Sequence, residues 1–294
     1  MYEGFKQIQI QTSDPEAKII GRTGGGGPPL LLLHGNPLTH VSWHRVAPRL
    51  AKDFTVVATD LRGYGDSSKP RGREDHSNYS FRRMAQDQVE VMQHLGFKQF
   101  FVAGHDRGAR TAFRMVLDHP DKVLKAAFLD ILPTHHVWTS VSMGWAINSY
   151  HWLFMAQPYD FPEQLLRGNE EYYIRKKLMK QGLGKGGFTE EEIREYIRVC
   201  TPEQIHGVCE DYRAAATIDF EMDKADFEAG RKVTCPVLVL WGGKSHTEHH
   251  YQPREAWPRY CSGIVRMAAL PCGHYPSEQA PEETYQELSA FFKG

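Results

Sequence analysis

The stretch Gln99-Phe-Phe-Val-Ala-Gly-His-Asp-Arg-Gly-Ala-Arg110 decides both the fold and the chemistry of this chain. Its apolar run, Phe100 to Ala103, is typical of a buried strand, and a helical pattern then continues to about Leu117. Two glycines flank one reactive side chain between the strand and the helix, which is the pattern of a turn that presents a nucleophile. The usual residue at the tip of such a turn is serine, whereas this chain has Asp106.

Apolar runs on both sides of this stretch alternate with helical patterns along most of the chain. Strands that are apolar along their whole length are buried on both faces, so helices must cover both sides of their sheet. With the strand at Phe100, the pattern predicts an α/β fold with a mostly parallel, eight-stranded sheet. The other predicted strands are Phe5 to Gln11, Lys18 to Arg22, Leu30 to Leu33, Thr55 to Thr59, Lys125 to Leu129, Pro236 to Trp241 and Ile264 to Leu270. The other predicted helices are Val41 to Leu50, a helix capped by Ser80 that runs to His94, Tyr251 to Tyr260 and Pro281 to Phe292.

One segment interrupts this alternation. From 135 to 219 the pattern is helical and rich in aromatic residues, and no buried strand is predicted there. Residues 1–134 and 220–294 are therefore expected to form one α/β core, with 135–219 inserted as a helical cap. Ligands bind at the carboxyl ends of the strands in such sheets, so the site should lie between the core and the cap.

Composition and charge exclude several classes of partner. The 294 residues include 35 Lys and Arg against 36 Asp and Glu, so no broad basic face is expected for nucleic acid or anionic membranes. No apolar run approaches the roughly 18 residues of a membrane span, and the first residues lack the apolar core of a signal peptide. The 5 cysteines lack metal-ligand spacing and are expected to be reduced thiols in the cytoplasm.

Three side chains, each just beyond the end of a predicted strand, form a candidate catalytic set. Asp106 lies in the turn, Asp130 ends the next strand, and His274 follows the last strand. The carboxyl ends of parallel strands meet at one edge of a sheet, so these residues can converge. Alone, Asp130 is also compatible with a helix cap and His274 with an ordinary turn residue, and Glu248 is an alternative acid. Their order along the chain favours a nucleophile, an acid and a base.

An aspartate nucleophile indicates displacement at a carbon atom followed by ester hydrolysis. An ionised carboxylate attacks an sp³ carbon without a general base, and water must then hydrolyse the ester on Asp106. His274 is the expected base for that water, and Asp130 is expected to orient His274. The backbone N–H groups of Asn36 and Arg107 are the expected donors to the oxyanion. Neither step needs a cofactor, and we expect no metal.

These motifs resemble the α/β-hydrolase superfamily, in the branch that holds haloalkane dehalogenases, epoxide hydrolases and fluoroacetate dehalogenases. The resemblance covers the whole chain and includes the turn at Asp106, the cap, His34-Gly35-Asn36-Pro37, Asp60 to Ser67, and the turn that contains His274. Haloalkane dehalogenases and epoxide hydrolases look like His-Asp-Trp-Gly at the nucleophile. This chain has His-Asp-Arg-Gly-Ala-Arg, which is similar to fluoroacetate (haloacetate) dehalogenases.

The resemblance to fluoroacetate dehalogenases implies roles for five further residues. Arg107 and Arg110 would hold the substrate carboxylate, and their spacing puts them on one face of the helix. The residues that would hold the leaving halide are His151, Trp152 and Tyr212. The expected reaction converts fluoroacetate, chloroacetate or bromoacetate to glycolate and halide. Arg114, one turn further on, is expected to be a solvated charge beside Asp118.

Three alternatives remain open at this point. An epoxide hydrolase would use two cap tyrosines, and Tyr150 and Tyr212 are candidates for that pair. A haloalkane dehalogenase-like enzyme is suggested by Asn36, where fluoroacetate dehalogenases often have an aromatic residue, and this leaves the preferred halogen undecided. A non-catalytic ligand-binding protein of this fold is disfavoured by the complete catalytic set. The expected partner is a small haloacid, and the resemblance also implies a homodimer.

Overall fold

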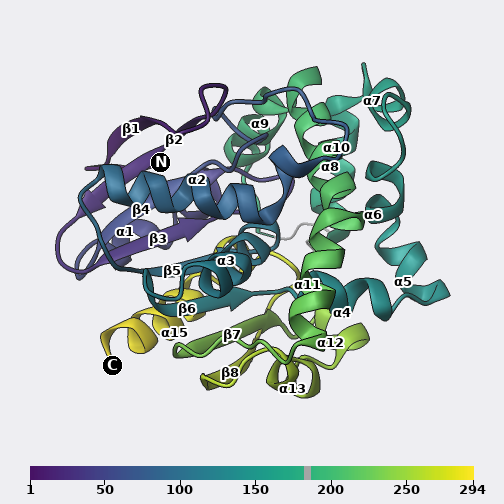
Figure 1. Cartoon of the computed structure of the whole chain (residues 1–294). Helices are drawn as coiled ribbons and strands as arrows, with labels where there is room; N and C mark the ends of the chain where they lie inside the picture. Colours follow the sequence, from purple (N-terminus) through teal and green to yellow (C-terminus); the bar gives the residue numbers. More distant parts are fainter. Residues whose placement is uncertain (182–186) are drawn as a thin grey trace.

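The computed structural model describes residues 1–181 and 187–294 and contains an eight-stranded sheet in the order β1-β2-β4-β3-β5-β6-β7-β8. β1 pairs antiparallel with β2, β2 pairs antiparallel with β4, and the strands from β4 to β8 in this order pair in parallel. The predicted α/β fold with a mostly parallel sheet is therefore confirmed (Figure 1). The strands are β1 (Lys6–Gln11), β2 (Lys18–Gly25), β3 (Pro29–Leu33), β4 (Thr55–Thr59), β5 (Phe100–His105), β6 (Val123–Leu129), β7 (Val237–Gly242) and β8 (Ile264–Leu270).

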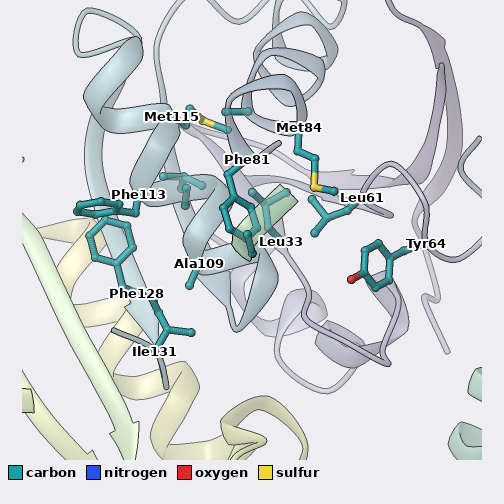
Figure 2. Close-up of a cluster of buried hydrophobic side chains, with 14 of the residues drawn as sticks. Leu33, Leu61, Tyr64, Phe81, Met84, Ala109, Phe113, Met115, Phe128 and Ile131 are labelled. Atoms are coloured by element: carbon teal, nitrogen blue, oxygen red, sulfur yellow. The ribbon is translucent and has the colours of Figure 1, made fainter. Parts of the chain in front are cut away.

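Two apolar cores, one on each face of the sheet, explain why the central strands are apolar along their whole length. Leu31 and Leu33 of β3 belong to the core beneath α2 (Phe81–His94) and α3 (Arg107–Asp118), part of which Figure 2 shows around Leu33 and Phe81. Leu30 and Leu32 belong to the opposite core, with α1 (Ala47–Leu50) and α15 (Pro281–Lys293). Successive side chains of a strand point to opposite faces, so a strand that serves both cores has no polar face.

Helices α4 to α11 all lie between β6 and β7 in the chain, and Figure 1 shows most of them together on one side of the sheet. The described residues from 134 to 228 contain no strand. Helix α11 crosses the predicted limit between 219 and 220, so the division into core and cap at that position stays a prediction. The helices are α4 (Thr134–Thr139), α5 (Met143–Asn148), α6 (Tyr150–Met155), α7 (Phe161–Leu166), α8 (Glu170–Gln181), α9 (Glu190–Val199), α10 (Pro202–Ala216) and α11 (Ile218–Glu228).

Prolines divide two of the predicted helices. The segment predicted as Val41 to Leu50 forms a 3₁₀ turn, His40–Trp43, and then α1, in whose first turn Pro48 lies. The segment predicted as Tyr251 to Tyr260 contains the end of α12 (His246–Tyr251), α13 (Pro253–Ala256) and the 3₁₀ turn Trp257–Arg259. Proline has no N–H to donate and favours the first turn of a helix, so each proline begins a new short element. A further short helix, α14 (Pro276–Gln279), precedes α15, and a 3₁₀ turn, Ser77–Tyr79, precedes α2.

Arg114 corrects one expectation. Its side chain is only 2% exposed, not solvated, and it pairs with Asp223 and Asp226 of α11 at 2.6 Å each. The expected contact with Asp118 is present at 3.3 Å. Helix α11 supplies both carboxylates from a distant part of the chain, which no local pattern reveals. Within the part of the chain that the structure describes, no helix is long and apolar enough to cross a membrane.

Candidate active site

Asp106 lies between the last residue of β5 and the first residue of α3, with a φ of 48° and a ψ of −117°. Such a conformation is rare for a residue other than glycine and costs about 1–3 kcal/mol, so the surrounding structure must impose it. The two flanking glycines permit the tight turn. A Cβ on Gly104 would lie 2.4 Å from the Gly108 carbonyl oxygen, and a Cβ on Gly108 would lie 2.5 Å from the His34 carbonyl oxygen.

The loop after β3 approaches Asp106 closely. The Asn36 backbone N–H donates to Asp106 Oδ1 at 2.8 Å, and a Cβ on Gly35 would lie 2.4 Å from the Cβ of Asp106. Glycine at position 35 is therefore what allows this approach. The Asn36 side-chain amide donates to the Tyr212 hydroxyl at 3.1 Å, so it connects the core loop to α10. The expected role of the Asn36 and Arg107 N–H groups toward an oxyanion stays a prediction.

The three predicted catalytic side chains meet at the carboxyl ends of β5, β6 and β8. His274 Nδ1 lies 2.6 Å from Asp130 Oδ2, and His274 Nε2 lies 3.8 Å from Asp106 Oδ2. Glu248, the alternative acid, instead accepts a hydrogen bond from Trp241 Nε1. The geometry therefore places Asp130 beside the histidine, and Asp106 on the other side of its ring.

Asp130 is held by groups from the neighbouring strand. The Gly242 backbone N–H and the Ser245 hydroxyl both donate to Asp130 Oδ1, at 2.8 and 2.7 Å. One carboxylate oxygen is thereby fixed, and the other is free to face His274. The sequence analysis missed this contact with Ser245, because only the pairing of β6 with β7 brings the two residues together.

The electrostatics of the three groups suit a carboxylate nucleophile and a histidine base. Burial opposes the charge of Asp106, but His274, His105, Arg107 and the Asn36 N–H together hold the pKa of this carboxyl well below its usual value. Burial also opposes a charged His274, but the hydrogen bond and charge of Asp130 outweigh it and raise the pKa of the imidazole. Asp106 is thus ionised, and His274 is a stronger base than a free histidine.

Arg107 is fully buried and pairs with Asp211 of α10, a residue that sequence reasoning missed. Its Nε donates to Asp211 Oδ2 at 2.8 Å, and its Nη2 donates to both the Asp211 carboxylate and the Asp211 carbonyl oxygen. The Tyr64 hydroxyl donates to the same carboxylate at 2.5 Å. Arg107 Nη1 has no hydrogen-bond partner among the described residues. The pair therefore orients the guanidinium and leaves one N–H₂ group for a ligand.

Arg110 lies one turn further along α3 and has no carboxylate partner in the described parts of the chain. Its Nη1 donates to the Leu132 carbonyl oxygen at 2.5 Å, and its Cζ lies 4.6 Å from the Trp152 ring centroid. Its Nε is buried and has no hydrogen-bond partner in residues 1–181 and 187–294. Burial, with the positive charge of Arg107, lowers the pKa of Arg110 to about 10. Arg110 lines a cavity of about 330 Å³ together with Asp106, Asp130, His151, Trp152 and His274.

His151 and Trp152 of α6 and Tyr212 of α10 form one cluster on the cap side. The Tyr212 ring centroid lies 5.7 Å from that of His151 and 5.6 Å from that of Trp152. Burial, and then the charge of Lys177, lower the pKa of His151 well below its usual value, so this imidazole is neutral. The structure brings all three residues together as predicted, whereas Tyr150 is 46% exposed. Their binding of halide stays a prediction.

Comparison with known proteins assigns this arrangement to a family. The family described as alpha/beta hydrolase fold matches residues 28–281. The chain belongs to the alpha/beta hydrolases. It is 44% identical to a fluoroacetate dehalogenase from Burkholderia sp., over 99% of this chain and 95% of that protein, and 34% identical to a soluble epoxide hydrolase from Corynebacterium sp., over 92% of both. The structure is similar to that of an alpha/beta hydrolase from Nostoc sp. PCC 7120, with 51% identity, a TM-score of 0.96 and 99% of each chain covered.

These comparisons confirm the predicted resemblance to fluoroacetate dehalogenases. Two other features of this alpha/beta hydrolase concern its histidines. His105 is fully buried, and its Nε2 lies 2.6 Å from the His274 carbonyl oxygen. His246 and His250 stack at 4.6 Å, but no group of three or more histidine, cysteine, aspartate or glutamate side chains within residues 1–181 and 187–294 is arranged to hold a metal ion.

Proposed function

We propose that this alpha/beta hydrolase is a haloacetate dehalogenase that converts fluoroacetate, chloroacetate or bromoacetate to glycolate and halide. One observation carries the proposal: two buried guanidinium groups of α3, Arg107 and Arg110, follow the nucleophile, and Nη1 of Arg107 and Nε of Arg110 have no hydrogen-bond partner among the residues that the structure describes. Buried cationic donors without partners favour an anionic ligand, and a guanidinium suits a carboxylate. A carboxylate held there would present its α-carbon to Asp106.

The proposed reaction has two steps. In the first, Asp106 attacks the α-carbon, an O–C bond forms, the C–halogen bond breaks, and the halide leaves with the electron pair. In the second, His274 removes a proton from water, whose oxygen attacks the Asp106 carboxyl carbon. The bond from that carbon to the glycolate oxygen then breaks, and the glycolate oxygen takes the proton from His274. Asp106 loses its carboxyl proton to solvent and is a carboxylate again. The Asn36 N–H, already bonded to Asp106 Oδ1, stabilises the oxyanion of this second step.

The same arrangement disfavours epoxide hydrolysis. A neutral epoxide offers no counter-charge to Arg107 and Arg110, and Tyr150, one of the two tyrosines that this reaction would use, is half-exposed. The 44% identity to a fluoroacetate dehalogenase over nearly the whole chain supports the haloacid substrate as well.

The test is to measure halide and glycolate after incubation with fluoroacetate, chloroacetate and bromoacetate, and diol after incubation with a simple epoxide. We expect halide release in equal amounts to glycolate, with no diol. Asp121→Asn, an exposed aspartate beyond α3, is a matched control that should keep full activity. Diol formation without halide release from any haloacetate would overturn the proposal.

The proposal also includes the partners, the cellular location and the oligomeric state of the enzyme. A small haloacid would be its partner, without nucleic acid or membrane, and the five cysteines, all free, are compatible with the cytoplasm. Cell fractionation tests this location. A homodimer would be detected by sedimentation analysis of the purified chain.

A further inference from the structure

Lys177 is a buried cation that the proposed reaction does not use. It lies on α8 and is only 7% exposed, and its Nζ has no hydrogen-bond partner among the described residues. An ammonium group without a counter-ion or hydrogen bonds is costly inside a protein. A position of this kind therefore favours a ligand that supplies negative charge.

Tyr173, one turn earlier on α8, also carries a buried polar group without a hydrogen-bond partner among the described residues. Residues four apart share one face of a helix, and Lys177 Nζ lies 5.9 Å from the Tyr173 ring centroid. The Tyr173 hydroxyl is also buried without a partner in the described residues. Tyr173 lines a small, largely apolar space together with Asn36 and Met155. Helix α8 thus brings Tyr173 to the loop after β3, whose Asn36 N–H donates to Asp106, and Lys177 lies one turn further along the same face of α8.

The charges around Lys177 belong to the active site. Asp106 is the carboxylate that supports its positive charge, whereas Arg107 and, on its own helix, Lys180 oppose it. Burial is the largest influence and lowers the pKa of Lys177 to about 7. From α6, the neighbouring group is His151, which is neutral, and Lys177 is the main charge that acts on it. Geometry connects α8 to the predicted halide residues, because Tyr173, next to Lys177, lines the same space as Asn36, whose amide donates to the Tyr212 hydroxyl.

We propose that Lys177 and Tyr173 complete the halide subsite from α8, with Lys177 as its cationic donor. This inference rests on the proposed function. When the Asp106 oxygen bonds to the α-carbon and the C–halogen bond breaks, the negative charge of Asp106 disappears and reappears on the halide. The positive charge of Lys177 therefore stabilises the Asp106 carboxylate before the reaction and the halide after it. This step transfers no proton. The ammonium lowers the barrier most for the leaving group that most needs stabilisation, which is fluoride.

The test compares leaving groups in three variants. Lys177→Met removes the charge and keeps the length of the side chain, and Tyr173→Phe removes only the hydroxyl. Lys176→Met is the matched control, because Lys176 is an exposed neighbour on the same helix. We expect Lys177→Met to reduce kcat for fluoroacetate about 10- to 100-fold and for bromoacetate only a few-fold, with no change for Lys176→Met.

Tyr173→Phe provides a second measurement if Lys177→Met does not fold. Removal of an unpaired hydroxyl should not destabilise the protein. We expect a loss for fluoroacetate of about fivefold, greater than the loss for bromoacetate. Equal losses for both substrates, or no loss in either variant, would overturn the assignment to the halide subsite. If the unmodified enzyme releases no halide from any haloacetate, the proposed function itself fails, so the two failures are distinguishable.

Discussion

Apart from the two arginines of α3, the two sides of the active site differ in how their polar groups are paired. On the core side, Asp106 accepts from Asn36, Asp130 accepts from Gly242 and Ser245, and the acid and the base contact each other. On the cap side, Asp211 pairs with Arg107, but Lys177 Nζ and the Tyr173 hydroxyl are buried and unpaired within the described chain.

This difference separates two functions of a buried polar group. A paired group is oriented before the substrate arrives, and that is what a nucleophile and a base require. An unpaired group keeps its hydrogen-bonding capacity for a ligand, and that is what a subsite for an anion requires. Substitutions on the core side should therefore affect every substrate alike, and substitutions on the cap side should depend on the leaving group.

The largest effect is expected from Asp106→Asn. Loss of the nucleophile should reduce turnover of all haloacetates about 10⁴-fold or more, because no ester can form. Single turnover of the unmodified enzyme in ¹⁸O-water, followed by mass spectrometry, should place the label in Asp106. A label found only in the product would contradict the ester mechanism.

Arg110→Met and Asp211→Asn should separate ligand binding from stability. Arg110→Met should reduce kcat/KM for haloacetates roughly 100-fold, by loss of a charged hydrogen bond to the substrate. It should lower the unfolding free energy by only about 1 kcal/mol, because the bond it breaks within the protein is the one to the Leu132 carbonyl oxygen. Asp211→Asn leaves Arg107 as a buried charge without its counter-ion and should lower the unfolding free energy by roughly 3–5 kcal/mol. Urea unfolding measures both. Equal destabilisation by the two substitutions would refute this contrast.

Tyr212→Phe should discriminate between leaving groups. The Tyr212 hydroxyl accepts from Asn36 Nδ2, which leaves its own hydrogen available for the halide. Its loss should reduce kcat about 10-fold for fluoroacetate and less for bromoacetate. Tyr172→Phe, at an exposed tyrosine of α8, is the control and should have no effect. A uniform loss for all halides would assign Tyr212 to the structure of the loop instead.

The acid side of the pH dependence of kcat should report His274. The base must be neutral, so activity is lost below its pKa, by about tenfold for each pH unit. Because Asp130 and Asp106 raise the pKa of His274, the midpoint should lie above the usual 6.5. Asp106 loses its charge in the ester, so Asp130 alone should maintain this shift when ester hydrolysis limits the rate. A midpoint below 6.5 would contradict the assignment of Asp130.

The smallest effect is expected from Ser245→Ala. One neutral donor to Asp130 would be lost while the Gly242 N–H remains, so kcat should fall only about fivefold, equally for fluoroacetate and bromoacetate. Dependence on the halide would place Ser245 on the leaving-group side, against the contrast between the two regions. Steady-state kinetics with both substrates decides this.

Local patterns in the sequence were sufficient to predict the eight strands and the functional residues at their ends. Asp106, Asp130 and His274 were predictable because parallel strands bring their carboxyl ends to one edge. The prolines at 48, 253 and 258 lie within two segments that were predicted as single helices from the spacing of their apolar residues. These prolines indicate the division of both segments into shorter elements. Asp211 and Lys177 had no such signal, because a charged residue on a cap helix usually faces water.

The sequence by itself determined the α/β fold, the aspartate nucleophile and the presence of two arginines beside it, since these depend on periodicity and on a turn of a few residues. Only the tertiary structure decided which charges are paired. Asp211 orients Arg107. The buried Arg114 pairs with Asp223 and Asp226, whereas Lys177 has no counter-ion among the described residues. The physical reason is that the energy of a charge depends on its burial and on partners from distant elements, and no local pattern contains either.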